Sequence, residues 1–147
     1  ARRGVGLDYA ERMCVTAACK ARLAGLGGRL SFVRGDSEHL PFDDGSFDMV
    51  TCNNSFHHYP HQSAVAAEMR RVLRPGGRLV VVDGFRDNVI GWFVYDVLVD
   101  RIEGPVHHAS WLAMRSLFAG AGLVDIRQGK HGLWVPLLLT AGSVGGR

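Results

Sequence analysis

The sequence predicts an α/β fold built on a parallel β-sheet. Its apolar segments are short β-branched runs, and longer segments with apolar residues at helical spacing separate them. This alternation is typical of parallel strands joined by crossover helices. A chain of 147 residues that is 47% hydrophobic is long enough to bury one core. We therefore predict a single domain over residues 1–147.

The first part of the chain alternates strands with helices. Strands are predicted at residues 2–8, 29–36, 47–54 and 78–85. The last of them, "RLVVVDGF", has the continuous apolar run of a strand that is buried on both faces. Helices are predicted at residues 9–28, ending at Gly27 and Gly28, and at residues 61–77, ending in "RPGG".

The last third of the chain has a different pattern. Residues 86–105 are rich in aromatic side chains and are predicted to be helical. A further helix is predicted at residues 108–123, with Ser110 as its N-cap. Residues 124–144 read as two strands around "GKHG", so we expect the chain to close with an antiparallel hairpin.

Charge and cysteine content exclude several classes of protein. The net charge is +3, and the basic residues are scattered among acids, so neither a nucleic-acid surface nor a membrane surface is predicted. The three cysteines lack CxxC spacing, which argues against a disulfide framework and against a zinc site. No apolar run reaches spanning length and no signal-peptide profile is present. We expect a soluble, cytoplasmic protein.

Acidic residues follow the first two predicted strands. Asp8 closes the first strand, and Asp36 lies at the end of the second. In a right-handed parallel unit both strand ends lie at the same edge of the sheet, where open α/β sheets bind their ligands. A carboxylate there can accept the two hydroxyls of a ribose, and a second can accept the exocyclic amine of an adenine. An adenosine group therefore suits the pair. Asp8 alone is equally explained as a helix N-cap.

Five segments carry a resemblance to a known family: "GLDYAERM", "FVRGDSEHLPFDDGSFDMV", "HHYP", "AEMRRVLRPGGRLVVVD" and "HASWLAMRSLFAGAGL". In their order and spacing they resemble class I S-adenosylmethionine-dependent methyltransferases of the small-molecule type, which includes the ubiquinone and menaquinone biosynthesis enzymes. The resemblance implies a Rossmann-like sheet, S-adenosyl-L-methionine as the cofactor, and a small-molecule methyl acceptor as the partner.

Carried over residue by residue, the resemblance implies contacts to the cofactor from Asp8, Tyr9, Met13, Asp36, Ser37 and Asn53. Asp8 would accept the ribose hydroxyls, with Tyr9 and Met13 near the adenosine. Asp36, through its carboxylate, and Ser37, through its backbone N–H, would contact the edge of the adenine. Asn53 would border the methionine part of the cofactor and the acceptor pocket.

One element of the family does not occur in this sequence. The family has a strand and a Gly-rich loop before the strand that matches "RRGVGLD", and no G-x-G-x-x-G is found in the chain. Since that strand is central, its absence would make residues 2–8 pair with residues 47–54 or would leave two open sheet edges. We therefore expect an N-terminally truncated methyltransferase domain. The alternative is a non-catalytic remnant or partner module that no longer binds cofactor.

The catalytic candidates lie in "NNSFHHYPH". His58 and Tyr59 follow the strand that borders the methyl group, where either could contact the acceptor or remove its proton. The alternative is that the His pair only shapes this loop. No metal site is expected from these histidines and Cys52, because no second cluster completes the coordination. His107 and His108, at the entry to the next helix, are interpreted as surface or capping residues, with the alternative that they face the active site. A short-chain dehydrogenase is disfavoured, because no Tyr is followed by Lys four residues later.

Overall fold

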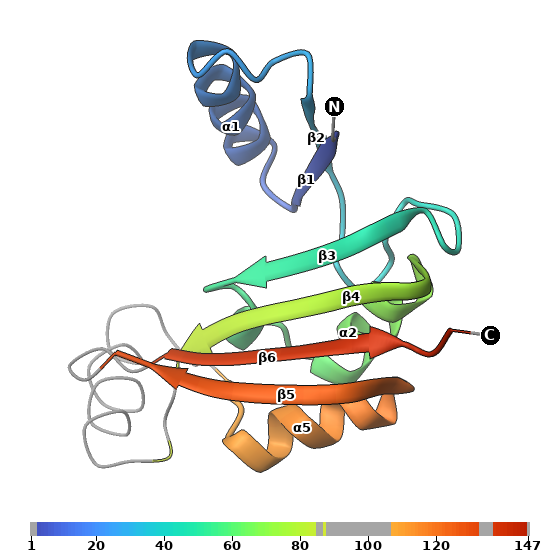
Figure 1. Cartoon of the computed structure of the whole chain (residues 1–147). Helices are drawn as coiled ribbons and strands as arrows, with labels where there is room; N and C mark the ends of the chain where they lie inside the picture. The colour runs from blue at the N-terminus through green and yellow to red at the C-terminus, as the bar shows by residue number, and fades with distance from the viewer. Residues whose placement is uncertain (1–2, 85–86, 88–106, 133–136, 147) are drawn as a thin grey trace. The chain divides into compact units, whose positions relative to one another are not determined.

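The computed structural model describes residues 3–84, 87, 107–132 and 137–146. The chain forms two compact units, Ala1–Pro41 and Phe42–Arg147 (Figure 1). Each unit has its own sheet, and their elements follow the predicted alternation of strands and helices. The α/β class is confirmed. The aromatic segment predicted to be helical at residues 86–105 falls almost entirely outside the described residues.

The first unit is one parallel strand–helix–strand motif. Strand β1 (Gly4–Asp8) pairs with β2 (Leu30–Arg34) in parallel, and helix α1 (Glu11–Leu23) connects them. The helix ends earlier than the predicted stop at Gly27. Gly25 adopts a φ of +72°, with N–H bonds from Gly25 to Arg22 O and from Leu26 to Ala21 O. This pair of bonds is a Schellman motif, which requires the left-handed conformation that glycine adopts without strain.

The second unit is a mixed four-stranded sheet in the order β3-β4-β6-β5. Its strands are β3 (Phe47–Asn53), β4 (Leu73–Gly84), β5 (Leu123–His131) and β6 (Leu137–Val144). β3 and β4 are parallel, whereas β6 is antiparallel to both β4 and β5. The predicted C-terminal hairpin is confirmed. Its predicted turn is wrong, because β5 continues through "GKH" and those residues pair with β6.

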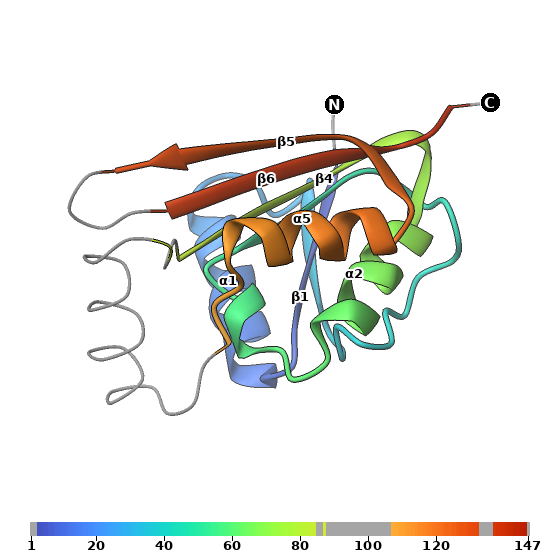
Figure 2. The same ribbon diagram turned by 90° about the horizontal axis from the view of Figure 1, so that it is seen from below.

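Two helices cover one face of this sheet. Helices α2 (Gln62–Arg71) and α5 (Trp111–Gly120) lie on the same side of β4, β6 and β5 (Figure 2). The core between helices and sheet contains large, fully buried side chains, including Phe56, Phe118, Leu79, Val81 and Leu138. Burial of a side chain of this size contributes about 1.5–3 kcal/mol, so this layer stabilises the second unit. Gly142 on β6 permits the close approach, because an added Cβ would lie 3.0 Å from the Phe118 ring.

The "RPGG" segment belongs to β4 and does not end helix α2 as predicted. The helix ends at Arg71, and Leu73 already pairs with Phe47 of β3. A register shift follows, and regular pairing resumes between Met49 and Arg78. Gly77 lies close to β3 here, since a Cβ would be 3.2 Å from the Asp48 carbonyl oxygen and 2.9 Å from that of Arg74. The glycines therefore accommodate an irregular strand start.

Arg71 fixes the chain just before β3. Its guanidinium donates to the Phe42 carbonyl at 2.9 Å, to Asp44 at 2.6 Å and to Glu68 at 2.7 Å. The hydrogen bonds from Glu68 and Asp44 raise the pKa of Arg71 above its ordinary value. One half-buried side chain thus connects helix α2 to the loop that leads into the sheet.

The predicted strands at residues 2–8 and 47–54 belong to different sheets. Within the described residues, β1 pairs with β2 and β3 pairs with β4, and each keeps one unpaired edge. Of the two expected outcomes, direct pairing of these strands or two open sheet edges, the structure has two open edges. No helix in the described part of the chain is long and apolar enough to cross a membrane.

Ser110 is the N-cap of α5, as predicted, and its removal tests that assignment. Its Oγ accepts the Ala113 N–H at 3.1 Å. We expect Ser110→Ala to lower the free energy of unfolding by about 1 kcal/mol, because one N–H of the first turn loses its acceptor. Denaturant titration followed by circular dichroism measures the change. Ser116→Ala, on the exposed face of the same helix, is the control and should leave stability unchanged or slightly higher. Equal losses in both variants would contradict the cap.

Candidate functional site

The two predicted acids lie at the carboxyl ends of paired parallel strands. Asp8 is the last residue of β1 and pairs in register with Arg34, the last residue of β2. Asp36 follows two residues later, and the Gly35 N–H donates to the Asp8 carbonyl at 3.0 Å. The side chain of Asp36 is 53% exposed. The first unit therefore presents both carboxylates at the edge where α/β sheets bind ligands.

Each of these carboxylates also makes a local hydrogen bond. Asp8 Oδ1 accepts the Ala10 N–H at 2.8 Å, and Asp36 Oδ1 accepts the Glu38 N–H at 2.9 Å. The N-cap position of α1 is Ala10, with no side-chain cap, so the N-cap interpretation of Asp8 is wrong. One oxygen of each acid thus orders the turn that follows its strand. Tight turns of this kind hold the carboxylates in fixed positions.

Apolar surface lies beside these acids in the first unit. The Tyr9 side chain is 72% exposed and that of Met13 is 56% exposed. Arg34 holds the Tyr9 segment, since its Nε donates to the Tyr9 carbonyl at 3.2 Å and its guanidinium lies 5.9 Å from the ring centroid. Ser37 is half-buried in the turn after Asp36. These predicted contact residues are available to a ligand.

The second unit has its own group of polar side chains at the carboxyl end of β3. Asn53 ends the strand and is exposed, and Asn54 adopts a φ of +49° while its N–H donates to Val82 O. The short helix η1 (Phe56–His58) follows. Beside it, the Ser55 and Tyr59 hydroxyls lie 2.8 Å apart. The predicted residues Asn53, His58 and Tyr59 are therefore brought to one strand end.

Cys52 is buried beneath this group. Burial raises the pKa of its thiol to about 11, partly offset by hydrogen bonding to Tyr59 and Ser55, while the Asp83 carboxylate adds to the increase. A thiol with a raised pKa remains protonated at neutral pH and is a poor nucleophile. Cys52 is therefore a small apolar residue of the core and has no role as a reactive thiol.

Three buried side chains meet next to η1, and we name them the Asp83 cluster: His57, Asp83 and His108. Their exposed fractions are 7%, 3% and 4%. His57 Nδ1 lies 2.5 Å from Asp83 Oδ1, and His108 Nδ1 lies 3.8 Å from the same oxygen. The Asp83 carboxylate also accepts the N–H groups of His57 and Gly84, each at 2.8 Å. The imidazole rings of His57 and His108 lie with their centroids 4.3 Å apart and their planes tilted by 32°.

This cluster corrects the interpretation of the histidines. His58, the predicted catalytic residue, is exposed, and its neighbour His57 is the one that is buried and paired. His108 was expected at the surface and is buried, whereas His107 is exposed as expected. The signal in the sequence is Asp83 itself, an acid near the carboxyl end of a strand, as Asp8 and Asp36 are.

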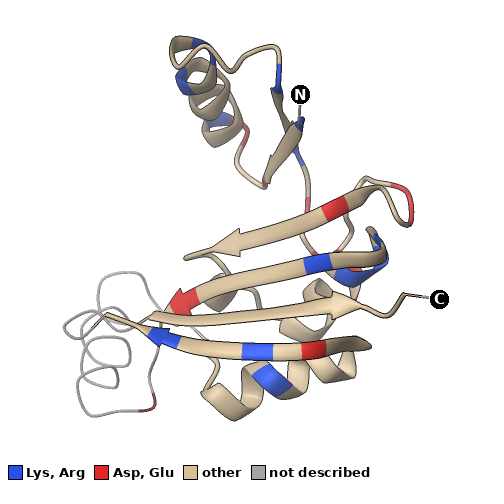
Figure 3. Ribbon diagram, viewed as in Figure 1, with Lys and Arg blue, Asp and Glu red and all other residues tan. Residues whose placement is uncertain are grey.

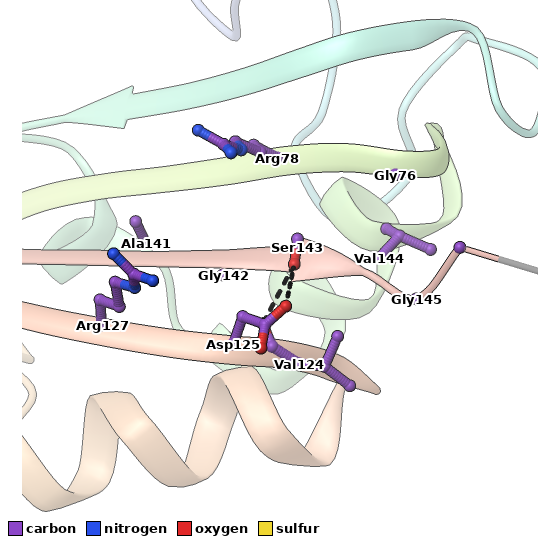
Figure 4. A pocket seen from close by; sticks show the side chains of 11 residues that line it. Gly76, Arg78, Val124, Asp125, Arg127, Ala141, Gly142, Ser143, Val144 and Gly145 are labelled. Atoms are coloured by element: carbon purple, nitrogen blue, oxygen red, sulfur yellow. Dashed lines mark hydrogen bonds between the residues drawn. The ribbon is translucent and has the colours of Figure 1, made fainter.

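A separate hollow lies at the other end of β4. It has a volume of about 530 Å³ and is bordered by Gly76 and Arg78 of β4, by the start of β5, and by the end of β6 (Figure 4). Arg78, Arg127 and Asp125 bring both signs of charge to it, and acidic and basic residues are similarly interspersed over the described chain (Figure 3). Because ligands of α/β sheets bind beyond the carboxyl ends of strands, we do not assign the active site to this hollow.

Comparison with protein families identifies the chain. A family model described as "Methyltransferase domain" matches residues 1–81, which is more than half of the chain. The chain belongs to the methyltransferase domain family. The match includes Asp8, Asp36 and the η1 segment, and it ends within β4. The resemblance found in the sequence is thereby confirmed.

Individual relatives match this methyltransferase domain over part of their length. A phthiotriol/phenolphthiotriol dimycocerosates methyltransferase of Mycobacterium leprae is 46% identical over 74 residues, which are 50% of this chain and 27% of that protein. A demethylmenaquinone methyltransferase of Listeria welshimeri is 38% identical over 87 residues, 59% of this chain and 36% of the relative. The chain thus spans between about a quarter and a third of these two curated relatives.

The fold is shared with solved methyltransferase structures. A SAM-dependent methyltransferase from Methanosarcina mazei has a TM-score of 0.76 at 20% identity, over 97% of this chain and 82% of that protein. At this identity the likeness shows the fold alone. It confirms the Rossmann-like methyltransferase architecture that the sequence predicted for this domain.

The buried thiol gives a prediction about pH. Cys19 is exposed and Cys52 is buried with a pKa of about 11. In a Cys14→Ser variant at pH 8, we expect iodoacetamide to modify Cys19 readily and Cys52 at least tenfold more slowly, because the thiolate is the reactive form. Modification of Cys52 should accelerate as the pH rises toward 11. Mass spectrometry of quenched samples measures both rates, with a urea-unfolded sample as the control for intrinsic reactivity. Comparable rates in the folded chain would contradict the burial.

The Asp83 carboxylate is expected to stabilise the second unit. We expect Asp83→Asn to lower the free energy of unfolding by about 1.5–3 kcal/mol, because an amide cannot accept all the N–H groups that the carboxylate accepts. Denaturant titration provides the measurement. Asp43→Asn, at an exposed position, should change stability by less than about 0.5 kcal/mol. If Asp83→Asn left the free energy of unfolding unchanged, the carboxylate would not be needed to hold η1.

Proposed function

We propose that this chain is part of an enzyme that transfers a methyl group from S-adenosyl-L-methionine to a small-molecule acceptor. Membership of the methyltransferase domain family supports the proposal. The observation that carries it is the position of Asp8 and Asp36, two carboxylates at the ends of adjacent parallel strands. A cofactor containing adenosine offers the hydroxyls and the amine that such acids accept.

The residues of the first unit fit that cofactor. Asp8 would accept the ribose hydroxyls, while Asp36 and the Ser37 N–H would contact the adenine. The exposed side chains of Tyr9 and Met13 provide apolar surface for the adenosine. Each acid accepts a backbone N–H of its own turn through Oδ1, and a carboxylate has room for several further donors. The turns hold both acids before a ligand arrives, which lowers the entropic cost of binding.

The residues of the second unit would serve the methyl acceptor. Asn53 would border the methionine part of the cofactor and the acceptor pocket. When bound, the cofactor supplies an electrophilic methyl group, so the protein's task is to align the acceptor atom and to remove its proton where needed. We assign that task to His58 and Tyr59. His58 is exposed to solvent, and the Tyr59 hydroxyl is held by Ser55.

The acceptor is proposed as a small molecule on the basis of the relatives. Their names refer to demethylmenaquinone and to phthiotriol dimycocerosates, which are not macromolecular substrates. We also place the enzyme in the cytoplasm, since its three cysteines are free, as in a reducing compartment. Neither nucleic acid nor membrane is proposed as a partner.

The first test is calorimetric titration of the folded 147-residue chain with S-adenosylhomocysteine. We expect binding, and we expect Asp36→Ala to weaken it by about 1 to 3 kcal/mol, or roughly 5- to 150-fold, because a buried adenine amine would lose its acceptor. Asp8→Ala should weaken binding to a similar extent through the ribose hydroxyls.

The matched control is Asp43→Ala, which removes an exposed carboxylate outside the strand ends and should leave affinity unchanged. If affinity is the same in the Asp36→Ala variant, Asp36 does not belong to the site. If a folded wild-type chain does not bind the ligand at all, the non-catalytic interpretation is favoured over the enzyme.

A further inference from the structure

We propose that the Asp83 cluster is a binding site for one divalent metal ion of the zinc type. It is the group of His, Cys, Asp and Glu side chains in the described residues whose candidate ligand atoms converge, all lying within 4.8 Å of one another. Two imidazoles and one carboxylate are a ligand set that transition-metal ions use repeatedly. The inference does not depend on methyl transfer, because it concerns only residues of the second unit.

The distances are close to those of a coordination site. Zinc binds His nitrogen and carboxylate oxygen at about 2.0–2.2 Å, so neighbouring ligand atoms of a tetrahedral site lie about 3.3 Å apart. His57 Nδ1 and Asp83 Oδ1 are 2.5 Å apart, and His108 Nδ1 is 3.8 Å from that oxygen. An ion would therefore move the first pair apart and draw His108 inward, by about 1.5 Å at most, since all the ligand atoms lie within 4.8 Å of one another. Side-chain torsions can provide shifts of that size.

The chemistry of the ligands selects the class of ion. Nitrogen ligands favour zinc and its transition-metal neighbours over calcium and magnesium, which prefer oxygen. His57 must present Nδ1 without a hydrogen, which the neutral ring then carries on Nε2. The Asp83–His57 hydrogen bond would thus be exchanged for two bonds to the same ion. The ion would then be the charged partner that a buried carboxylate favours.

The surroundings of the cluster hold its members in place. The Asp83 carboxylate is oriented by the N–H groups of His57 and Gly84, as metal-binding carboxylates usually are by further hydrogen bonds. The two histidine segments are joined as well. The His107 N–H donates to the His57 carbonyl at 2.8 Å, and Gln62 Nε2 donates to the carbonyls of Phe56 and His107. An ion would therefore connect η1, the end of β4 and the start of the α5 segment.

The spacing of residues in the sequence does not reveal this set of ligands. The histidines of "HHYPH" have no second cluster near them in the sequence to complete a coordination sphere. The fold supplies that second cluster from Asp83 and His108, which lie 26 and 51 positions away from His57 in the chain. Separations of this length carry no spacing signal in a sequence.

The test is titration of the chelator-treated, folded chain with Co²⁺, followed by visible absorption. We expect one equivalent to produce the ligand-field bands of a four- or five-coordinate site, and one equivalent of Zn²⁺ to abolish them. His108→Gln should weaken Co²⁺ binding by at least tenfold, because it removes a ligand. His107→Gln is the matched control, since it removes the exposed neighbouring histidine, and it should bind as the wild type does.

A second measurement on the wild type avoids variants that fail to fold. X-ray absorption of the chain loaded with one equivalent of Zn²⁺ should show two imidazoles and no sulfur. A sulfur ligand, an absence of stoichiometric Co²⁺ bands, or equal loss of binding in His107→Gln and His108→Gln would overturn the proposal. The cluster would then be a hydrogen-bonded network only.

Discussion

The buried Asp83 carboxylate is the constraint on which the functional end of the second unit depends. A carboxylate that is 3% exposed must be surrounded by donors, because an unpaired buried charge is very unfavourable. Asp83 meets this requirement with two N–H groups and an imidazole. Two of these donors belong to His57, so the position of η1 follows from the position of the end of β4. The side chains that η1 and its flanks carry toward the strand end are placed as a consequence.

Most of the fold could be predicted because hydrophobic pattern decides it. β1, β2 and β3 all appear where short apolar runs predicted them, and the Ser110 cap and C-terminal hairpin were read from local residue types. The errors in the predicted fold lie at the ends of helices and strands. Gly25 ends α1 through a Schellman motif, although the sequence offered Gly27 and Gly28 as equally good stops. Local pattern does not say which of several nearby glycines the backbone will use.

The predictions for the "RPGG" and "GKH" segments were wrong for a different reason. Pro and Gly signal breaks in isolation, yet "GKH" is paired with β6, and "RPGG" lies in β4 between residues that pair with β3. Leu73 pairs with Phe47 before the irregular register of β4, and Lys130 pairs with Leu138. Tertiary pairing therefore overrode the local preference. The Asp83 cluster was missed by the same limit, since its histidines come from segments that only the fold brings together.

Burial gives the three acids at strand ends two different roles: Asp8 and Asp36 remain accessible to a ligand, whereas Asp83 is bonded within the protein. Asp8, Asp36 and Asp83 each lie at or just after the end of a strand, and the sequence gives no reason to separate them. Asp36 is about half exposed and Asp8 is half-buried, and each accepts a backbone N–H of its own turn through Oδ1, so a ligand can still reach the carboxylate. Both oxygens of Asp83 already accept hydrogen bonds from the protein. A ligand at Asp83 must therefore replace a bond that the fold uses, and a metal ion can do so because it offers charge as well as coordination. The accessible carboxylates of Asp8 and Asp36 suit an organic ligand, whereas the buried carboxylate of Asp83 suits a metal ion.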